Sequence, residues 1–247
     1  LPILMQCMDR FPQKKEVQTV CVEILTKLCD DQDVLDSMDE DVLRALYTLL
    51  LRFPYDQALV LATVRCIRRM LSVSELCDKF MKMEGVSRVF SVMKSFKSMD
   101  ILQAALEIID IVMPKDEAYV RRLLIEYSDN LLDMLPECGE YTSLLSTTLK
   151  LLCSVHRDIH AKLVSHLDAL CSLAVQFATD KEIIKYLYSL LCEVAEDADD
   201  SLLQRMHDLK VTKATIESIA SNRTSKSMVK STTSLMAALV ANKEAAE

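Results

Sequence analysis

The sequence of 247 residues has two glycines, five prolines and no tryptophan, and aromatic residues make up 5% of it. Glycine-rich phosphate loops and the tight turns of β-sandwiches need more glycine than this, so both classes of fold are excluded. Charged residues interrupt every apolar run well before the roughly 20 residues of a membrane span, which predicts a soluble chain. The remaining residues are 51% apolar and rich in Leu, Ala, Met, Glu and Lys, which indicates a mostly helical protein.

The net charge of the chain is −8, from 29 basic and 37 acidic side chains. This field repels a phosphate backbone, so we expect no nucleic-acid partner. The nine cysteines include no Cys-x-x-Cys pair and lie mostly in apolar segments, which is typical of reduced thiols in a cytoplasmic protein. We expect no direct membrane insertion by this region. Because the sequence does not begin with methionine, we expect further residues before Leu1, and a lipid anchor would lie there.

An apolar pattern recurs six times along the chain. In each copy, apolar residues flank a variable position with the spacing i, i+2, i+3, i+6, which is typical of one wide face of an α-helix. The variable position holds Glu23, Arg65, Glu107, Lys150, Ser189 and Ser234. The steps between these positions are 42, 42, 43, 39 and 45 residues. A period of about 42 residues is typical of helical repeat proteins.

A second feature has the same period and precedes the repeated helix. Phenylalanine recurs at Phe11, Phe53 and Phe96, and proline follows the first two, which ends a helix and fixes a corner. A short polar helix and a medium apolar helix are predicted between successive long ones. Gly85 lies at their junction, where we expect a chain reversal that favours a residue without Cβ. Each repeat therefore contains three predicted helices.

The spacing, the three-helix order and the Glu-Gly-Val junction at Gly85 together resemble the armadillo repeat family. HEAT repeats are an alternative, because their period overlaps. The resemblance implies a single domain over residues 1–247, an all-α, right-handed superhelical armadillo-like solenoid of about six repeats. The third helices, which would line a concave groove that receives an extended peptide, are predicted near residues 14–29, 57–71, 100–113, 142–156, 181–195 and 226–241.

The resemblance implies that side chains of the third helices contact the partner. Import receptors of the family have a Trp and an Asn on several third helices, and the matching positions here hold neither, which argues against that activity. The candidate partner-binding residues are Lys27, Arg65, Arg68, Arg69, Lys150, Tyr186 and Glu193.

Four of these candidates form a predicted basic cluster. Arg65 and Arg69 are one helical turn apart, Arg68 is adjacent, and Lys27 is the counterpart of Arg69 in the neighbouring repeat. Such a cluster suits an acidic peptide. Alternatively, Glu23, Arg65 and Glu107 neutralise one another as a solvated ladder of alternating charge.

The tyrosines near the groove helices have two interpretations. Tyrosine is a frequent anchor at protein interfaces. Tyr188 occupies an apolar position, which favours a place in the core. For Tyr186 both interpretations remain open.

The sequence predicts no metal site, catalytic residue or cofactor. Cys153, His156, His160 and His166 are metal-ligand types, but a predicted helix end at residues 156–160 would scatter them. Motifs for nucleophilic catalysis, zinc hydrolysis and phosphate binding are absent, so an enzyme is not expected.

Three polar segments have local explanations. The acidic segments 30–41 and 196–200 are predicted to cap helix N-termini. The serine-rich segment 221–234 is predicted to be a loop before the last helix, with a phosphorylatable segment as the alternative.

A chain composed only of repeats is predicted to act through contact, as a non-enzymatic scaffold or adaptor that binds other proteins in the cytoplasm through acidic or extended segments. Its architecture is similar to that of the stand-alone armadillo-repeat adaptors of apicomplexan parasites. This resemblance implies an acylated N-terminus on the cytosolic face of the rhoptry membrane and recruitment of a myosin motor that positions the organelle. The alternative is the regulatory armadillo region of a larger kinase or GTPase.

Overall fold

The computed structural model describes residues 1–196, 198–221, 232–237 and 239. These residues form helices and connecting segments and contain no β-strand, as the composition predicts. The chain divides into two compact units, Leu1–Leu123 and Leu124–Glu247. The boundary between the units lies within a helix, α9 (Glu117–Met134), and not in a linker.

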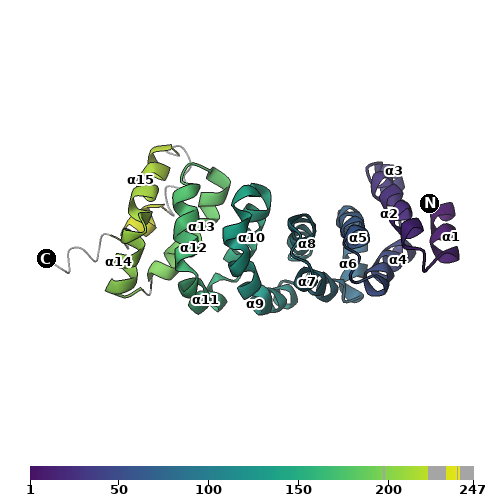
Figure 1. Cartoon of the computed structure of the whole chain (residues 1–247), viewed down its shortest axis with the longest axis horizontal. Coiled ribbons are helices and arrows are strands. Elements are labelled where there is room, and N and C mark those ends of the chain that lie inside the picture. The colour runs from purple at the N-terminus through teal and green to yellow at the C-terminus, as the bar shows by residue number, and fades with distance from the viewer. Residues whose placement is uncertain (197, 222–231, 238, 240–247) are drawn as a thin grey trace. The chain divides into compact units, whose positions relative to one another are not determined.

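The first unit contains three helices of 14 residues, α2 (Lys15–Leu28), α5 (Gln57–Met70) and α8 (Met99–Val112), of which α5 packs on the other two. Its other helices are α1 (Pro2–Arg10), α3 (Gln32–Asp36), α4 (Glu40–Arg52), α6 (Ser74–Lys82) and α7 (Gly85–Ser95). The third helices α2, α5 and α8 lie side by side in one layer, and α4, α6 and α7 lie beneath this layer in Figure 1. Each of α1, α4 and α7 packs on the third helix that follows it.

The repeated apolar positions form the core of this unit. Leu25, Ile67 and Ile109, at one repeated position, are completely buried, as are Cys66 and Ile108 at the position before it. The first repeat differs. The counterpart of Cys66 there is Ile24, and its side chain is 40% exposed. The physical reason is that α5 packs between α2 and α8, whereas among the described helices α2 has a third helix on one side only.

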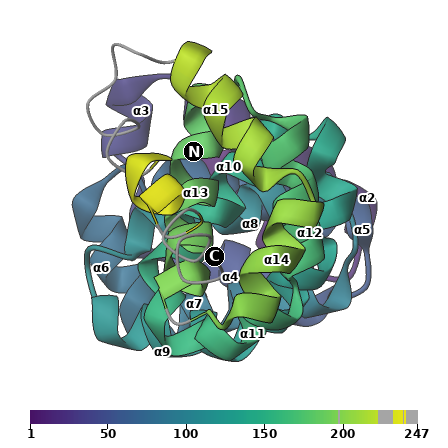
Figure 2. The ribbon, with the colours of Figure 1, turned by 90° about the vertical axis from the view of Figure 1, so that its left-hand side faces the viewer.

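The second unit continues the same order of helices. Its elements after α9 are η1 (Leu135–Glu140), α10 (Thr142–Ser154), η2 (His156–Ile159), α11 (His160–Ser165), α12 (Leu167–Gln176), α13 (Lys181–Glu196), α14 (Asp200–Asp208) and α15 (Val211–Ser221). The third helices α10 and α13 pack together, and α12 packs on both α13 and α15. Figure 2 looks onto the end of this unit and shows α14 beside α12, with α15 above them in the view.

Part of the last predicted repeat lies outside the described residues. Of the helix predicted at 226–241, residues 232–237 and 239 are described, and they are helical. Leu235 is completely buried, as its repeated apolar position requires. Most of the serine-rich segment 221–234, including residues 222–231, is outside the described residues.

The fourth repeat departs from the three-helix prediction. One helix of 18 residues, α9, followed by the short η1, stands where two helices were expected. In the preceding repeat the break between α6 and α7 occurs at Glu84, whose φ of 58° takes the chain out of the helix. The segment 117–134 contains neither glycine nor proline, so no residue stops α9.

The corners follow the phenylalanine pattern. Phe11, Phe53 and Phe96 are the C-terminal caps of α1, α4 and α7, and each backbone N–H donates to a carbonyl of the preceding turn. Phe177 takes the same place after α12, although no proline follows it and the sequence pattern missed it.

Gly85 is needed for a different reason from the one predicted. The residue in the left-handed region is Glu84, and Gly85 itself is the first residue of α7 without positive φ. A Cβ at position 85 would lie 2.3 Å from Cε2 of the Phe80 ring. Gly85 is therefore required for the close approach of α7 to a buried aromatic ring, not for the reversal.

Acidic residues cap helix N-termini, as predicted. In the segment 30–41, Asp31 accepts hydrogen bonds from two backbone N–H groups of α3, and Asp39 does the same for α4. In the segment 196–200, Asp199 accepts the N–H of Leu202 in α14 at 2.8 Å. These carboxylates satisfy donors that the first turn of a helix leaves unpaired.

Candidate protein-binding surface

The exposed side of α2, α5 and α8 carries most of the predicted partner-binding residues. We call this surface the first wall and define it by Glu23, Lys27, Asp30, Arg65, Arg68, Arg69, Asp100 and Glu107. The buried side of the same helices holds the apolar core, so the helical period itself directs the charged residues outward. The structure thus brings Lys27, Arg65, Arg68 and Arg69 to one surface of the first unit.

The three arginines of α5 bind carboxylates of their neighbours. The ion pairs join Arg65 to Asp100 at 2.9 Å, Arg68 to Glu107 at 2.7 Å, and Arg69 to Asp30. The side chains in these pairs are between 29% and 69% exposed. Solvent screens pairs of this kind, so each contributes about 0.2–1 kcal/mol to stability.

The predicted ladder of Glu23, Arg65 and Glu107 is wrong in its partners. Arg65 pairs with Asp100, and Glu107 is held by Arg68 and by Gln103, whose Nε2 donates to it at 2.5 Å. The general idea of neutralisation within the surface is correct, because each arginine has a carboxylate.

A stagger between the helices explains the different partners. With a step of 42 residues, Arg69 corresponds to Lys27 in the preceding repeat. Its partner is instead Asp30, three positions after Lys27. Arg68 corresponds to Asp110 in the next repeat. Its partner is instead Glu107, three positions before Asp110. Both displacements have the same direction, which indicates that α2, α5 and α8 are shifted along their axes relative to one another. Alignment of the repeats cannot reveal this shift.

Lys27 differs from the arginines. It is exposed, and within the described part of the chain neither Lys27 nor Glu23 forms an ion pair. A partner that approaches the first wall therefore meets one cation and one anion that the chain leaves to solvent.

The other three candidates lie in the second unit, on α10 and α13. Lys150 is exposed on α10. Tyr186 of α13 is half-buried, and Nζ of Lys185 lies 4.9 Å from its ring centre. Glu193 accepts from Nε2 of His156 at 3.2 Å. Tyr188 is 1% exposed, which confirms its prediction as a core residue.

The predicted metal-ligand types have other contacts. Cys153 Sγ donates to the carbonyl oxygen of Tyr186 at 3.2 Å, and burial raises the pKa of this thiol to about 12. Nδ1 of His156 lies 2.5 Å from the carbonyl oxygen of Cys153. Among the described residues no group of three or more His, Cys, Asp or Glu side chains is placed to hold a metal ion. All nine cysteines fall within the described ranges, and all are free thiols.

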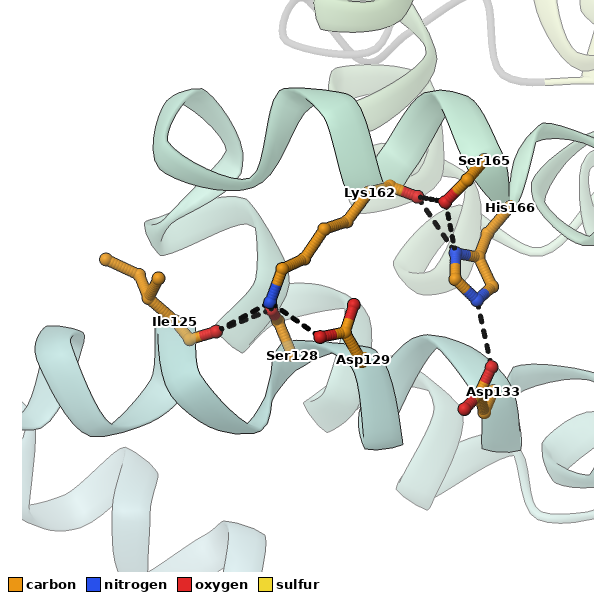
Figure 3. Close-up of polar contacts among 7 residues, drawn as sticks. All are labelled: Ile125, Ser128, Asp129, Asp133, Lys162, Ser165 and His166. Carbon is orange, nitrogen blue, oxygen red and sulfur yellow. Dashed lines mark hydrogen bonds and ion pairs between the residues drawn. The ribbon is translucent and has the colours of Figure 1, made fainter.

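A polar network that the sequence did not reveal joins α9 to α11. Nζ of Lys162 reaches back to α9 and donates to the carbonyl of Ile125 at 3.1 Å, to Oγ of Ser128 at 3.0 Å and to Asp129 at 2.8 Å (Figure 3). All three donors of the ammonium group are thus used. The network fastens the uninterrupted α9 to the next repeat, at a distance of 33 to 37 residues in sequence.

His166 makes a second link in the same network. Its Nε2 lies 3.0 Å from Oδ1 of Asp133, and its Nδ1 lies 2.8 Å from the carbonyl of Lys162 (Figure 3). Burial lowers the pKa of His166, but the hydrogen bonds with Asp133 and Lys162 and the charges of Asp133 and Asp129 outweigh burial, so the pKa is raised. The side chain stabilises the contact most strongly when it is protonated.

In the described residues, no helix combines the length and apolar character needed to cross a bilayer.

Comparison with known proteins identifies the fold. No protein-family model matches the chain, and no curated protein matches it. Among solved structures, the chain is similar to the designed armadillo repeat protein YIII(Dq)4CqI, with a TM-score of 0.63, 17% identity, and coverage of 97% of this chain and 99% of that one.

Two further solved structures are similar. One is the designed armadillo repeat protein YIII(Dq.V1)4CPAF in complex with peptide (KR)4, with a TM-score of 0.61, 16% identity, and coverage of 97% and 99%. The other is an engineered protein of the Northeast Structural Genomics Consortium, with a TM-score of 0.62, 12% identity, and coverage of 97% and 96%. These matches confirm the predicted all-α, armadillo-like solenoid fold.

Proposed function

We propose that this chain is a non-enzymatic scaffold that binds partner proteins through the first wall. The observation that carries the proposal is the alignment of α2, α5 and α8, which presents charged side chains of three successive repeats on one exposed surface. A designed protein of the same fold was solved with a bound peptide, (KR)4, which supports a peptide as the kind of ligand that this fold accepts.

The arginines of the first wall favour a partner with carboxylates in an extended segment. Asp30, Asp100 and Glu107 already show where carboxylates bind on α5. Because these pairs are solvent-exposed and each contributes only about 0.2–1 kcal/mol, a partner's carboxylate replaces the chain's own at little cost. The guanidinium fork then binds the incoming carboxylate through two parallel hydrogen bonds. Lys27 adds a cation that no carboxylate of the described chain occupies.

The experiment is affinity capture from lysate with quantitative mass spectrometry. It compares wild type with Lys27→Glu/Arg69→Glu and with the matched control Lys82→Glu/Lys94→Glu. Lys82 and Lys94 are exposed on α6 and α7, outside the first wall, and their replacement changes the net charge equally.

We expect recovery of specific partners to fall about tenfold or more for the first-wall variant, which is typical of the loss of a charged anchor, and to stay unchanged for the control. Circular dichroism and urea unfolding show that both variants are folded. Equal recovery by all three proteins would exclude the first wall as the contact surface.

Several finer predictions of the sequence extend this proposal. Binding by Lys150, Tyr186 and Glu193 of the second unit stays a prediction. A cytoplasmic location on the cytosolic face of the rhoptry membrane, an upstream lipid anchor, recruitment of a myosin motor, and the alternative of a regulatory region in a larger kinase or GTPase also stay predictions. The full-length sequence distinguishes them, because an N-terminal acylation signal favours the adaptor and a catalytic domain favours the regulatory region.

A further inference from the structure

A pocket of about 620 Å³ lies between α1, α2 and α4 of the first unit. None of its lining residues belongs to the first wall. Its apolar lining includes Met5 and Met8 from α1 and Val42, Ala45 and Leu49 from α4. The volume is within the range of sites that bind ligands. Methionine side chains adapt to different apolar shapes, which is typical of surfaces that bind peptides.

The hydrogen bonds around this pocket restrict what can bind there. Gln18 Nε2 donates to the carbonyl oxygens of Met8 and Phe11, each at 2.9 Å, and Arg52 Nη1 donates to that of Pro12 at 3.0 Å. The N-terminus of α4 is capped by Asp39.

Within residues 1–52, all of which the structure describes, the carbonyl groups of Met8, Phe11 and Pro12 and the first amides of α4 are therefore already paired. An extended peptide would find these backbone groups occupied and would leave most of its own amides unsatisfied. A helix satisfies its own backbone, so a helix is the suitable occupant.

Charge at the rim determines the flanks of that helix. Asp9 and Asp41 are exposed lining residues, and neither forms an ion pair within the described chain. The lining residue Arg44 is already paired with Glu40. Arg52 also lines the pocket, and its described partner is the carbonyl oxygen of Pro12. The lining therefore holds three aspartates, Asp9, Asp39 and Asp41, against the two arginines Arg44 and Arg52. This excess of carboxylate beside an apolar floor complements a helix with basic residues next to its apolar face.

We propose that this pocket binds an amphipathic helix of a partner protein, with aliphatic side chains three or four residues apart in the pocket and Lys or Arg at their flanks. The site is separate from the first wall, so the two surfaces can bind different segments or different partners. Failure of either proposal leaves the other standing.

The experiment uses a fluorescein-labelled peptide of about 18 residues, composed of Leu, Lys and Ala with Leu at helical spacing, titrated with the 247-residue chain. Fluorescence anisotropy measures binding. Ala45→Trp fills the pocket, and Asp9→Asn/Asp41→Asn removes the rim charge. The matched control is Glu16→Gln/Asp33→Asn, which removes the same charge from exposed positions of α2 and α3 outside both the pocket and the first wall.

We expect saturable binding that weakens about tenfold for Ala45→Trp and for the Asp9/Asp41 variant, and that is unchanged for the Glu16/Asp33 control. If Ala45→Trp does not fold, the comparison of the two charge variants still decides. A scrambled peptide of the same composition should bind at least tenfold more weakly, as expected for loss of the apolar face.

Three results would overturn the proposal. The first is equal weakening by both charge variants or equal binding of the scrambled peptide, which would indicate nonspecific attraction to an acidic protein. The second is the absence of saturable binding. The third is a concentration-dependent dimer in sedimentation that Ala45→Trp abolishes, which would assign the pocket to a second copy of this chain.

Discussion

Replacement of Gly85 with alanine is expected to destabilise the first unit, although position 85 is helical and has no positive φ. A Cβ there would lie 2.3 Å from Cε2 of Phe80 and 2.5 Å from Cδ2 and Cζ of the same ring. Favourable carbon–carbon contacts occur at about 3.5–4.0 Å. Phe80 is completely buried, so its ring cannot move into solvent to make room.

Two opposing effects set the magnitude. Alanine is a better helix former than glycine by about 1 kcal/mol in a helix interior, and by less at the first helical position. Overpacking of a well-packed core costs about 1–3 kcal/mol. We therefore expect the free energy of unfolding to fall by about 1–2 kcal/mol in the Gly85→Ala variant.

Urea unfolding followed by far-ultraviolet circular dichroism measures this loss. A double-mutant cycle with Phe80→Leu isolates the steric cause, because leucine leaves space where the ring was. In the Phe80→Leu background, Gly85→Ala should cost at least about 1 kcal/mol less than in wild type.

An unchanged or higher free energy of unfolding for Gly85→Ala in the wild-type chain would contradict a steric clash with Phe80. An equal cost in both backgrounds would also refute it, because the ring would then not be the cause.

Three further predictions concern the backbone and the ion pairs. Glu84→Gly should raise the free energy of unfolding by about 0.5–1 kcal/mol, since a left-handed conformation costs a residue with a Cβ about 1–2 kcal/mol and glycine loses part of this through entropy; a lower urea midpoint would contradict it. The raised pKa of His166 means that its pair with Asp133 contributes fully below the unfolded pKa of about 6.5 and is lost as pH rises through the higher folded pKa. Wild type should therefore exceed Asp133→Asn in urea midpoint at about pH 5 and converge with it toward about pH 8, and a constant difference would count against this. A double-mutant cycle on Arg68 and Glu107 should give a coupling of about 0.2–1 kcal/mol that declines in about 1 M salt, and a coupling insensitive to salt would show that the pair is not screened.

The positions of the repeated helices could be predicted because burial imposes a regular pattern on sequence. Leu25, Ile67 and Ile109 are apolar for one shared reason, contact with neighbouring repeats, and that reason recurs with the period of the fold. Caps such as Asp31 and Asp39 were likewise predictable, because a carboxylate before a helix satisfies its first amides.

Contacts between repeats could not be predicted in the same way. The partners of Arg65 and Arg69 depend on the axial stagger of stacked helices, and no spacing within one helix records that stagger. The role of Gly85 depends on the approach of the Phe80 ring. These features are set by tertiary packing, not by local pattern. The uninterrupted α9 is different, because the absence of glycine and proline from residues 117–134 is visible in the sequence.

Cross-linking from the first wall tests the central claim most directly. A photoreactive phenylalanine derivative would replace Glu23 or Arg65 on the first wall, and Lys82 or Lys94 outside it. We expect the same partner protein to be cross-linked from positions 23 and 65 and not from positions 82 and 94. Partners cross-linked only from positions 82 and 94 would contradict this claim.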